Sequence, residues 1–326
     1  MIYKLVISIL ISFIICFLMC LLGIPLLKKI KVGQPVLKYV EKHKNKNGTP
    51  TMGGIFFIFS LLLVFFITKN SGKIAIATLT VSLAFFVVGF LDDFLKVKSH
   101  DNQGLKAYQK IIFQLIISLF LGIYAYINGL DKLIIPYFNI KIELGLFIVP
   151  FSVLVLIAST NAVNLTDGLD GLSASVTVCY LFFFSALIYF QKTQTLSIIN
   201  SNEIDSLVYL SASLLGALIA FLLFNVNKAS VFMGDSGSLA LGGYLGTISL
   251  LTFNSLYLLV LGAMFVLSIV SVIVQVLYYK KTKKRVFLMA PYHHHLQMKG
   301  LTESKISFIY SVITCIIGLT IIISYL

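Results

Sequence analysis

Apolar segments long enough to cross a bilayer recur along the whole chain, and this limits the possible folds more than any other feature. A transmembrane helix needs about 20 mainly apolar residues. Such segments lie near 3–27, 53–68, 74–91, 111–127, 144–160, 172–191, 206–224, 238–253, 256–278 and 305–326. With 59% hydrophobic and 11% charged residues, the composition excludes a soluble globular domain. We predict an all-α integral membrane protein, a polytopic bundle of about ten transmembrane helices in a single domain over residues 1–326.

The distribution of Lys and Arg predicts how this bundle is oriented. If every predicted span crosses once, one side carries the loops 28–52, 92–110, 161–171, 225–237 and 279–304. Together with Lys305, these loops hold nineteen of the 25 Lys and Arg residues. The positive-inside rule makes this side cytoplasmic, so both termini are expected to be extracytoplasmic. The net charge of +13 then reflects orientation and attraction to anionic membrane lipid, and we expect no nucleic-acid binding.

Two adjacent carboxylates, Asp92 and Asp93, follow directly on the apolar run that ends at Leu91. We expect a helix to end there, where the helix dipole disfavours negative charge. One interpretation is that Lys96 and Lys98 simply offset this charge. The other is a bound cation or acid–base chemistry, because adjacent carboxylates repel each other and their pKa values shift easily.

Amides and carboxylates recur at a three-residue period in the next predicted cytoplasmic loop, Asn161-Ala-Val-Asn164-Leu-Thr-Asp167-Gly-Leu-Asp170-Gly171. Its two Asp-Gly pairs are turn signals, so a plain polar turn is one interpretation. Polar groups of this kind beside a membrane span are costly to place unless they bind something. The segment is therefore also a candidate binding site.

The segment Phe232-Met-Gly234-Asp235-Ser-Gly237-Ser238 opens another predicted span. Asp235 or Ser236 could be a helix N-cap. The pattern also suits a phosphate group, because glycines allow close approach and the N-terminal end of a helix is positive. A carboxylate there can bind the Mg²⁺ that accompanies a diphosphate.

Three further groups are weaker signals when each is taken alone. The segment Lys46-Asn-Gly48-Thr49-Pro50-Thr51-Met-Gly53-Gly54 combines a basic residue, hydroxyl groups and a glycine-rich approach to a span. Lys110 lies just before a span, where a lysine often reaches the membrane surface. His293, His294 and His295 lack the spacing and Cys partners of a structural zinc site, so donors to phosphate or sugar fit them better.

Five motifs occur in the order GTPTMGG, FLDDF, NAVNLTDGLDGL, VFMGDSGSL and APYHHH. Together they resemble the phospho-N-acetylmuramoyl-pentapeptide transferase family, also called MraY or translocase I. The resemblance covers essentially the whole chain, and every motif falls in a predicted cytoplasmic loop. The specificity lies in the combination, since each motif alone is short.

The resemblance implies a homodimeric enzyme of the bacterial plasma (inner) membrane, with its active site facing the cytoplasm. Such an enzyme transfers phospho-N-acetylmuramoyl-pentapeptide from UDP-N-acetylmuramoyl-pentapeptide to undecaprenyl phosphate, which yields lipid I and UMP in peptidoglycan synthesis. Mg²⁺ is the expected cofactor. We expect direct attack by the lipid phosphate oxygen, with Asp92 removing a residual proton or orienting the nucleophile. A covalent route through an aspartate nucleophile is the alternative.

The resemblance also implies roles for individual residues. Asp92 and Asp93 match the family's paired catalytic aspartates, and Asp235 matches its catalytic, magnesium-binding one. The uridine pocket is matched by Lys46, Gly168, Leu169, Asp170, Asn225 and Phe232, with the Phe232 ring stacking on the base. Positions near the diphosphate and sugar are matched by Thr51, Lys110, Asn164, Asp167, His293, His294 and His295.

Three departures from the family pattern concern loop shape rather than phosphate chemistry. Lys228 stands where the family usually has Pro, and Leu296-Gln297 replaces the commoner Phe-Glu. The chain also has no Trp, including after Gly300, where the family often has one. We expect these changes to affect the muramoyl or peptide side of the pocket.

Two other functions are compatible with parts of this pattern. A sibling transferase that moves N-acetylglucosamine-1-phosphate onto a polyprenyl phosphate shares the aspartate chemistry, but MAPYHHH together with GTPTMGG favours the muramoyl enzyme. A transporter is the remote alternative, because ionisable groups in membrane proteins often mark conduction paths. Here these groups lie at loop ends on one side rather than at midplane, which argues against a conduction path.

Overall fold

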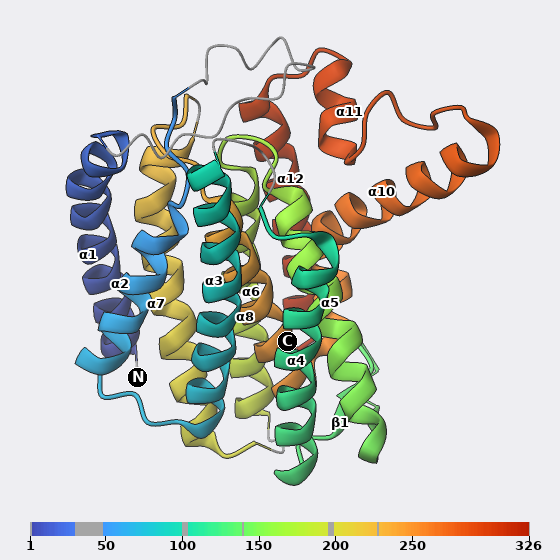
Figure 1. Cartoon of the computed structure of the whole chain (residues 1–326). Coiled ribbons are helices and arrows are strands. Elements are labelled where there is room, and N and C mark those ends of the chain that lie inside the picture. Colours follow the sequence, from blue (N-terminus) through green and yellow to red (C-terminus); the bar gives the residue numbers. More distant parts are fainter. Residues whose placement is uncertain are drawn as a thin grey trace.

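The computed structural model describes residues 2–29, 48–99, 104–138, 140–194, 199–226 and 228–325. Within this part of the chain, the structure is mainly helical, with one short two-stranded hairpin between α4 and η2 (Figure 1). The elements are α1 (Ile2–Lys29), α2 (Gly54–Ile67), α3 (Lys73–Ser99), α4 (Ala107–Ile127), β1 (Lys132–Ile134), β2 (Lys141–Glu143), the 3-10 helix η2 (Gly145–Phe147), α5 (Ile148–Thr166), α6 (Leu172–Thr193), α7 (Ser201–Asn225), α8 (Gly234–Leu251), α9 (Ser255–Leu261), α10 (Ala263–Thr282), α11 (Tyr292–Met298) and α12 (Glu303–Ile323).

The helices from α1 to α8 stand side by side and alternate in direction, so successive connections lie at opposite ends of one bundle (Figure 1). We call the end at which α3 ends and α8 begins the site end. The other end carries the antiparallel hairpin, in which Lys132 pairs with Glu143. This alternation brings every motif of the sequence to the site end.

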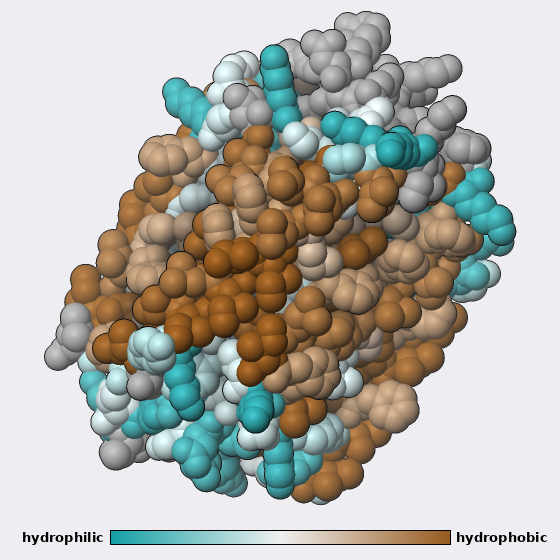
Figure 2. All heavy atoms as spheres, turned by 90° about the vertical axis from the view of Figure 1, so that its left-hand side faces the viewer, coloured by the Kyte–Doolittle hydropathy of each residue, from teal (hydrophilic) through white to brown (hydrophobic). Residues whose placement is uncertain are grey.

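Eight helices in the described part of the chain are long and apolar enough to cross a membrane: α1, α3, α4, η2 with α5, α6, α7, α10 and α12. Figure 2 shows apolar side chains over the middle of one face of the molecule and hydrophilic side chains at both ends. The prediction of a polytopic helical membrane protein is confirmed. Two predicted spans are exceptions, because α2 has only 14 residues and α8 contains many glycine and serine residues.

Helix α8 is the central helix of the bundle, and every residue from Ser236 to Leu251 is buried. Its small residues allow close packing on all sides, as in many membrane bundles. A Cβ at Gly242 would overlap the backbone of Thr160 on α5, and a Cβ at Gly54 on α2 would overlap the backbone of Gly237. An interior helix needs no lipid-facing surface, which explains the low hydropathy of α8.

The predicted span at 256–278 is wrong as a single helix. The chain leaves the helical conformation at Gly262, which has φ −84° and ψ 20°, and this residue separates α9 from α10. Glycine is among the residues least favourable to a continuous helix. Beyond the break, α10 leans away from the bundle (Figure 1).

Several predicted helix ends are also wrong, and the difference matters for the site. Helix α3 continues past Leu91 to Ser99, and α5 continues to Thr166. The ion pair between Asp92 and Lys96, one helical turn apart at 2.6 Å, supports the added length of α3. Asp92 and Asn164 therefore project from rigid helices rather than from loops.

Gly89 allows α3 to pack closely against the start of α8. A Cβ at this position would overlap the carbonyl group of Asp235 and press on the Cα of Ser236. We expect Gly89→Val to push the two helices apart and to destabilise the protein by about 1–3 kcal/mol, the usual effect of overpacking. Thermal unfolding in detergent measures this, with Val87→Leu at a half-exposed position of the same helix as the control. Equal unfolding temperatures for both variants would contradict the expected overlap.

Candidate functional site

The carboxylate of Asp235, in the first turn of α8, is the meeting point of four helices. Its Oδ2 atom lies 2.6 Å from Lys110 Nζ on α4 and 3.1 Å from Lys96 Nζ on α3. On the other side, Asn164 of α5 donates from Nδ2 to Asp235 Oδ1 at 2.8 Å. The same amide group of Asn164 donates to Ser238 Oγ at 2.8 Å. These bonds fix the orientation of Asp235 before any ligand is present.

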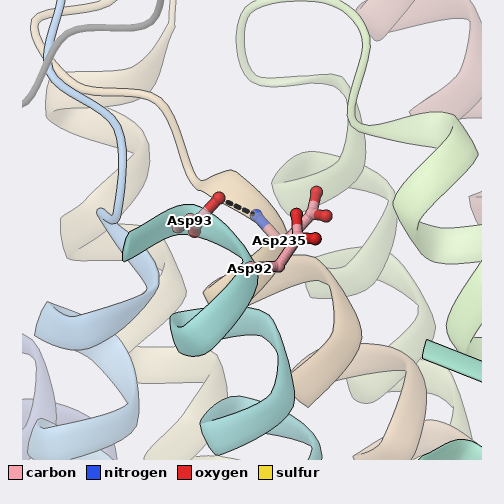
Figure 3. Close-up of side chains that lie close together, drawn as sticks. All are labelled: Asp92, Asp93 and Asp235. Carbon is pink, nitrogen blue, oxygen red and sulfur yellow. Dashed lines mark hydrogen bonds between the residues drawn. The ribbon is translucent and has the colours of Figure 1, made fainter. Parts of the chain in front are cut away.

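Asp92 lies opposite Asp235, and Figure 3 shows the two carboxylates side by side. Together with Lys96, Lys110 and Asn164, these two residues form a cluster that we call the cage. Asp92 is fully buried. Its Oδ2 atom lies 2.6 Å from Lys96 Nζ, and its Oδ1 atom lies 3.0 Å from Lys110 Nζ. The N–H of Leu105 also donates to Oδ1 at 2.7 Å. Each lysine therefore bridges both aspartates.

Asp93 has a different environment from its neighbour, and Figure 3 shows an oxygen of its carboxylate directed at the backbone nitrogen of Asp235. It accepts hydrogen bonds from the backbone N–H groups of Asp235 at 3.1 Å and Ser236 at 2.9 Å. A carboxylate at a helix N-terminus satisfies unpaired N–H groups and complements the helix dipole. The N-cap interpretation of Asp235 or Ser236 is wrong, because Met233 is the N-cap residue without a side-chain cap and Asp93 provides the cap from another helix.

The donor set of this cluster fits a hard divalent cation. Asp92, Asp93 and Asp235 each offer an oxygen, and these atoms all lie within 4.8 Å of one another. Mg²⁺ prefers one or two carboxylates together with phosphate oxygens and water. Asp92 and Asp235 suit this role, whereas both oxygens of Asp93 already accept backbone N–H groups.

An unsatisfied hydroxyl group borders the cluster. Thr51 Oγ1 is buried and has no hydrogen-bond partner in the described part of the chain. A Cβ at Gly234 would contact both this atom and Asp93 Oδ2, so the three groups adjoin. A buried polar group without a partner is costly, and Thr51 is therefore placed to donate to a ligand.

Asp167 and the histidine segment meet on one side of the cage. Burial raises the pKa of the Asp167 carboxyl well above its usual range, and the nearby carboxylates of Asp235 and Asp93 raise it further. The next residue, Gly168, lies against the rings of His293 and His294, since a Cβ there would clash with both. The motifs at 161–171 and 290–295 thus belong to one site.

The loop at 48–53 and the loop before α8 are joined by backbone hydrogen bonds. The N–H of Phe232 donates to the carbonyl of Pro50, and the N–H of Gly53 donates to the carbonyl of Phe232, both at 2.8 Å. The Phe232 side chain is half-buried. Lys46, predicted to bind uridine, lies outside the described residues.

Two other residues predicted to bind uridine hold loops in place. Asp170 is buried and accepts from the N–H of Ala229 at 3.1 Å. Asn225 accepts from the N–H of Gly171 at 3.2 Å and donates to the carbonyl of Val231 at 2.9 Å. These bonds position the backbone that precedes Phe232, while Leu169 is buried and Gly168 is exposed.

Comparison with known proteins identifies the family. A model of glycosyl transferase family 4 matches residues 75–253, and signature 1 of phospho-N-acetylmuramoyl-pentapeptide transferases matches residues 46–58. The phospho-N-acetylmuramoyl-pentapeptide-transferase of Clostridium botulinum (strain Alaska E43 / Type E3) is 43% identical over 303 residues, which cover 90% of this chain and 89% of the relative. The chain belongs to the phospho-N-acetylmuramoyl-pentapeptide-transferase family.

Further relatives carry the same name. The transferase of Clostridium beijerinckii is 44% identical over 302 residues, or 90% of this chain and 89% of the relative. That of Desulfitobacterium hafniense is 39% identical over 311 residues, or 94% of this chain and 92% of the relative. The similarity therefore spans the whole helical bundle and is not confined to the motifs.

The departures from the family pattern have local structural counterparts. Lys228 has φ 62°, which a proline ring cannot adopt, so the loop at this point differs from one that carries proline. Gln297 is buried, its Nε2 lies 3.4 Å from Glu303 Oε1, and its Oε1 pairs with His294 Nδ1 at 3.2 Å. The amide can donate to Glu303, which a glutamate at this position could not do.

Sequence reasoning missed one member of the cage. Lys96 was interpreted only as a counter-charge for a helix end, yet its side chain is 14% exposed and bridges Asp92 and Asp235. The sequence does contain a signal for the pairing of Lys96 with Asp92, because residues four apart lie on one helix face. Using this signal requires knowing that α3 continues beyond Asp93.

The cap on α8 predicts a stability effect for Asp93. In Asp93→Ala, the buried N–H groups of Asp235 and Ser236 lose their acceptor, and we expect a loss of about 1–3 kcal/mol for each unpaired group. Unfolding by heat in detergent measures the change. Ser236→Ala is the matched control, because it retains the backbone N–H. Similar stability of the two variants would show that the cap contributes little.

His293 predicts a pH dependence of stability. Burial lowers the pKa of His293 to about 3, with a smaller contribution from His294, and neither ring nitrogen has a hydrogen-bond partner in the described part of the chain. The unfolded state, with an ordinary pKa near 6.5, binds the proton first as the pH falls. Stability should therefore decline between about pH 6.5 and 3, by up to about 1.4 kcal/mol per pH unit.

The substitution His293→Phe should remove this part of the acid sensitivity. Unfolding temperatures of both proteins at pH 7.5 and pH 5.5 provide the comparison. The wild-type protein should lose more stability between the two pH values than the variant does. An identical loss in both proteins would indicate that the ring is protonated in the folded state.

Proposed function

We propose that this protein transfers phospho-N-acetylmuramoyl-pentapeptide from UDP-N-acetylmuramoyl-pentapeptide to undecaprenyl phosphate, which forms lipid I and releases UMP. Membership of the family supports this reaction. The observation that carries it is the cage in which Asp92, Lys96, Lys110, Asn164 and Asp235 converge from four helices. Paired carboxylates beside fixed cations suit the transfer of a charged phosphoryl group.

The proposal includes a location and a topology. The site end would face the cytoplasm from the bacterial plasma membrane, as the excess of Lys and Arg in its loops supports. With α2 and α8 counted, the chain would cross ten times and place both termini outside. Residues Thr51 to Gly54, where α2 begins, are buried in protein, and non-helical backbone at membrane depth is tolerated in such places. Family membership is the support for a homodimer.

In the proposed reaction, an oxygen of the lipid phosphate attacks the sugar-bearing phosphorus, and the bond from that phosphorus to the UMP oxygen breaks. A phosphate monoester is largely dianionic at neutral pH, so a strong base is unnecessary. Asp92 would accept a residual proton or orient the nucleophile. Lys110 would neutralise charge on the diphosphate, with the hydroxyl of Thr51 as a further donor. The ring of Phe232 would stack on the uracil base, with Asp167 and the histidines beside the sugar.

Magnesium is the proposed cofactor, and Asp235 with Asp92 would hold it. When bound, it would stabilise the negative charge that develops on the phosphate oxygens. Asn164 keeps Asp235 in the required orientation through its 2.8 Å hydrogen bond. Asp93 would act as a positioning residue, since it fixes the start of α8.

A UMP-release assay in detergent tests the proposed function. Purified protein with Mg²⁺ and undecaprenyl phosphate should release UMP from UDP-N-acetylmuramoyl-pentapeptide, and much less from UDP-N-acetylglucosamine. Preferential use of the second donor would identify the sibling transferase instead. Because the assay needs no membrane gradient, release of UMP also excludes transport as the sole function.

Removing the charge of Asp235 should abolish this activity. We expect Asp235→Asn to lower UMP release at least about 100-fold, as when a fixed charge-stabilising group is lost, while the protein still folds. Asp205→Asn, at the other end of the bundle where Asp205 pairs with Lys192, is the control for a lost ion pair. Near-normal release by Asp235→Asn would remove this residue from the mechanism.

A further inference from the structure

We propose that Lys96 occupies the cation position of the cage in the free protein, so that a divalent ion binds only by displacing its ammonium group. This inference rests on the proposed function only in taking the ion to be the cofactor of the transferase. It makes Lys96 a residue that controls metal affinity.

The geometry of Lys96 is that of a bound cation. Its Nζ atom lies between the two carboxylates best suited to a metal, 2.6 Å from Asp92 Oδ2 and 3.1 Å from Asp235 Oδ2. Its side chain is 14% exposed, against 26% for Lys110. Lys96 is also held one turn from Asp92 on the same helix, whereas Lys110 enters from the beginning of α4. Lys96 is therefore the more enclosed of the two cations.

Charge prevents the metal and both ammonium groups from sharing this space. Lys96 and Lys110 contact the same atom, Asp235 Oδ2, and a divalent ion bound there would lie within a few ångströms of both. Repulsion between like charges at such distances is strong in a buried site. The ion must then move at least one lysine, and Lys96 holds the enclosed position between Asp92 Oδ2 and Asp235 Oδ2 that the ion would take.

The displaced ammonium group needs a new anionic partner, and a diphosphate provides one. Metal affinity should therefore be low in the free protein and higher when a diphosphate ligand is present, which is a positive coupling between the two. An enzyme of this kind would take up the ion together with its donor. Lys96 would then lie against phosphate oxygens during the reaction.

Direct binding of Mn²⁺, measured by electron paramagnetic resonance on the purified full-length protein without nucleotide, tests the inference. Lys96→Gln should bind Mn²⁺ at least about tenfold more tightly than the wild type, since a charged hydrogen bond contributes more than the roughly 1.4 kcal/mol that corresponds to a factor of ten. Lys98→Gln is the matched control, because Lys98 is an exposed lysine of the same helix. It should bind as the wild type does.

Two further variants make the result decisive. Lys96→Arg keeps the positive charge and should retain weak binding, whereas Lys96→Met removes the charge and should bind tightly even if Lys96→Gln does not fold. Unchanged or weaker Mn²⁺ binding in a folded charge-removing variant would overturn the inference. This experiment measures metal binding, whereas UMP release by the wild-type protein tests the proposed transferase function. Failure of the inference can therefore be told apart from failure of the proposed function.

Discussion

The site depends on one contact, in which the carboxylate of Asp93 on α3 caps the first turn of α8. Both Asp93 oxygens accept backbone N–H groups, from Asp235 and Ser236, and the contact is closed because Gly89 has no side chain. A buried carboxylate and the positive end of a helix each need a partner in a region with little water. Their pairing sets the position of Asp235, and through it the distance between the two carboxylates of the cage.

The charges of the cage are balanced within the protein. Asp92 and Asp235 face each other, and Lys96 and Lys110 each contact both of them. Such a set is stable without a ligand and still presents oxygen atoms to an incoming ion. Asp93 is adjacent to Asp92 in sequence but is not part of this set of ion pairs, because its carboxylate accepts backbone N–H groups of α8. Adjacent residues on one helix thus make different contacts, Asp92 with the lysines and Asp93 with the start of α8.

The central helix explains how a polar site can be built at the end of an apolar bundle. Helix α8 begins with polar residues and continues as a buried helix rich in small residues. Close packing by Gly242 and Gly237 brings α5 and α2 against it. The side chain of Asn164 and the loop at Thr51 are carried toward Asp235 by the same packing, so the stability of the bundle and the geometry of the site have a common origin.

The sequence by itself determined the membrane class, the family and the set of polar residues that meet at the site end. A membrane span is predicted from the composition of about 20 consecutive residues, and the family is predicted from the identity and order of short motifs. Neither prediction requires knowledge of contacts between distant segments. Eight of the predicted spans also correspond to helices long and apolar enough to cross a membrane, although 256–278 is broken at Gly262.

Only the tertiary structure decided which contacts each residue of that set makes. The environments of Asp92 and Asp93 differ because α3 continues to Ser99 and directs one carboxylate to the lysines and the other to α8. Asp170 and Asn225 hold loops through bonds to residues far along the chain. Lys96 enters the cage because α4, α5 and α8 close around it. These outcomes depend on contacts between distant segments, which the spacing of residues within one segment does not define.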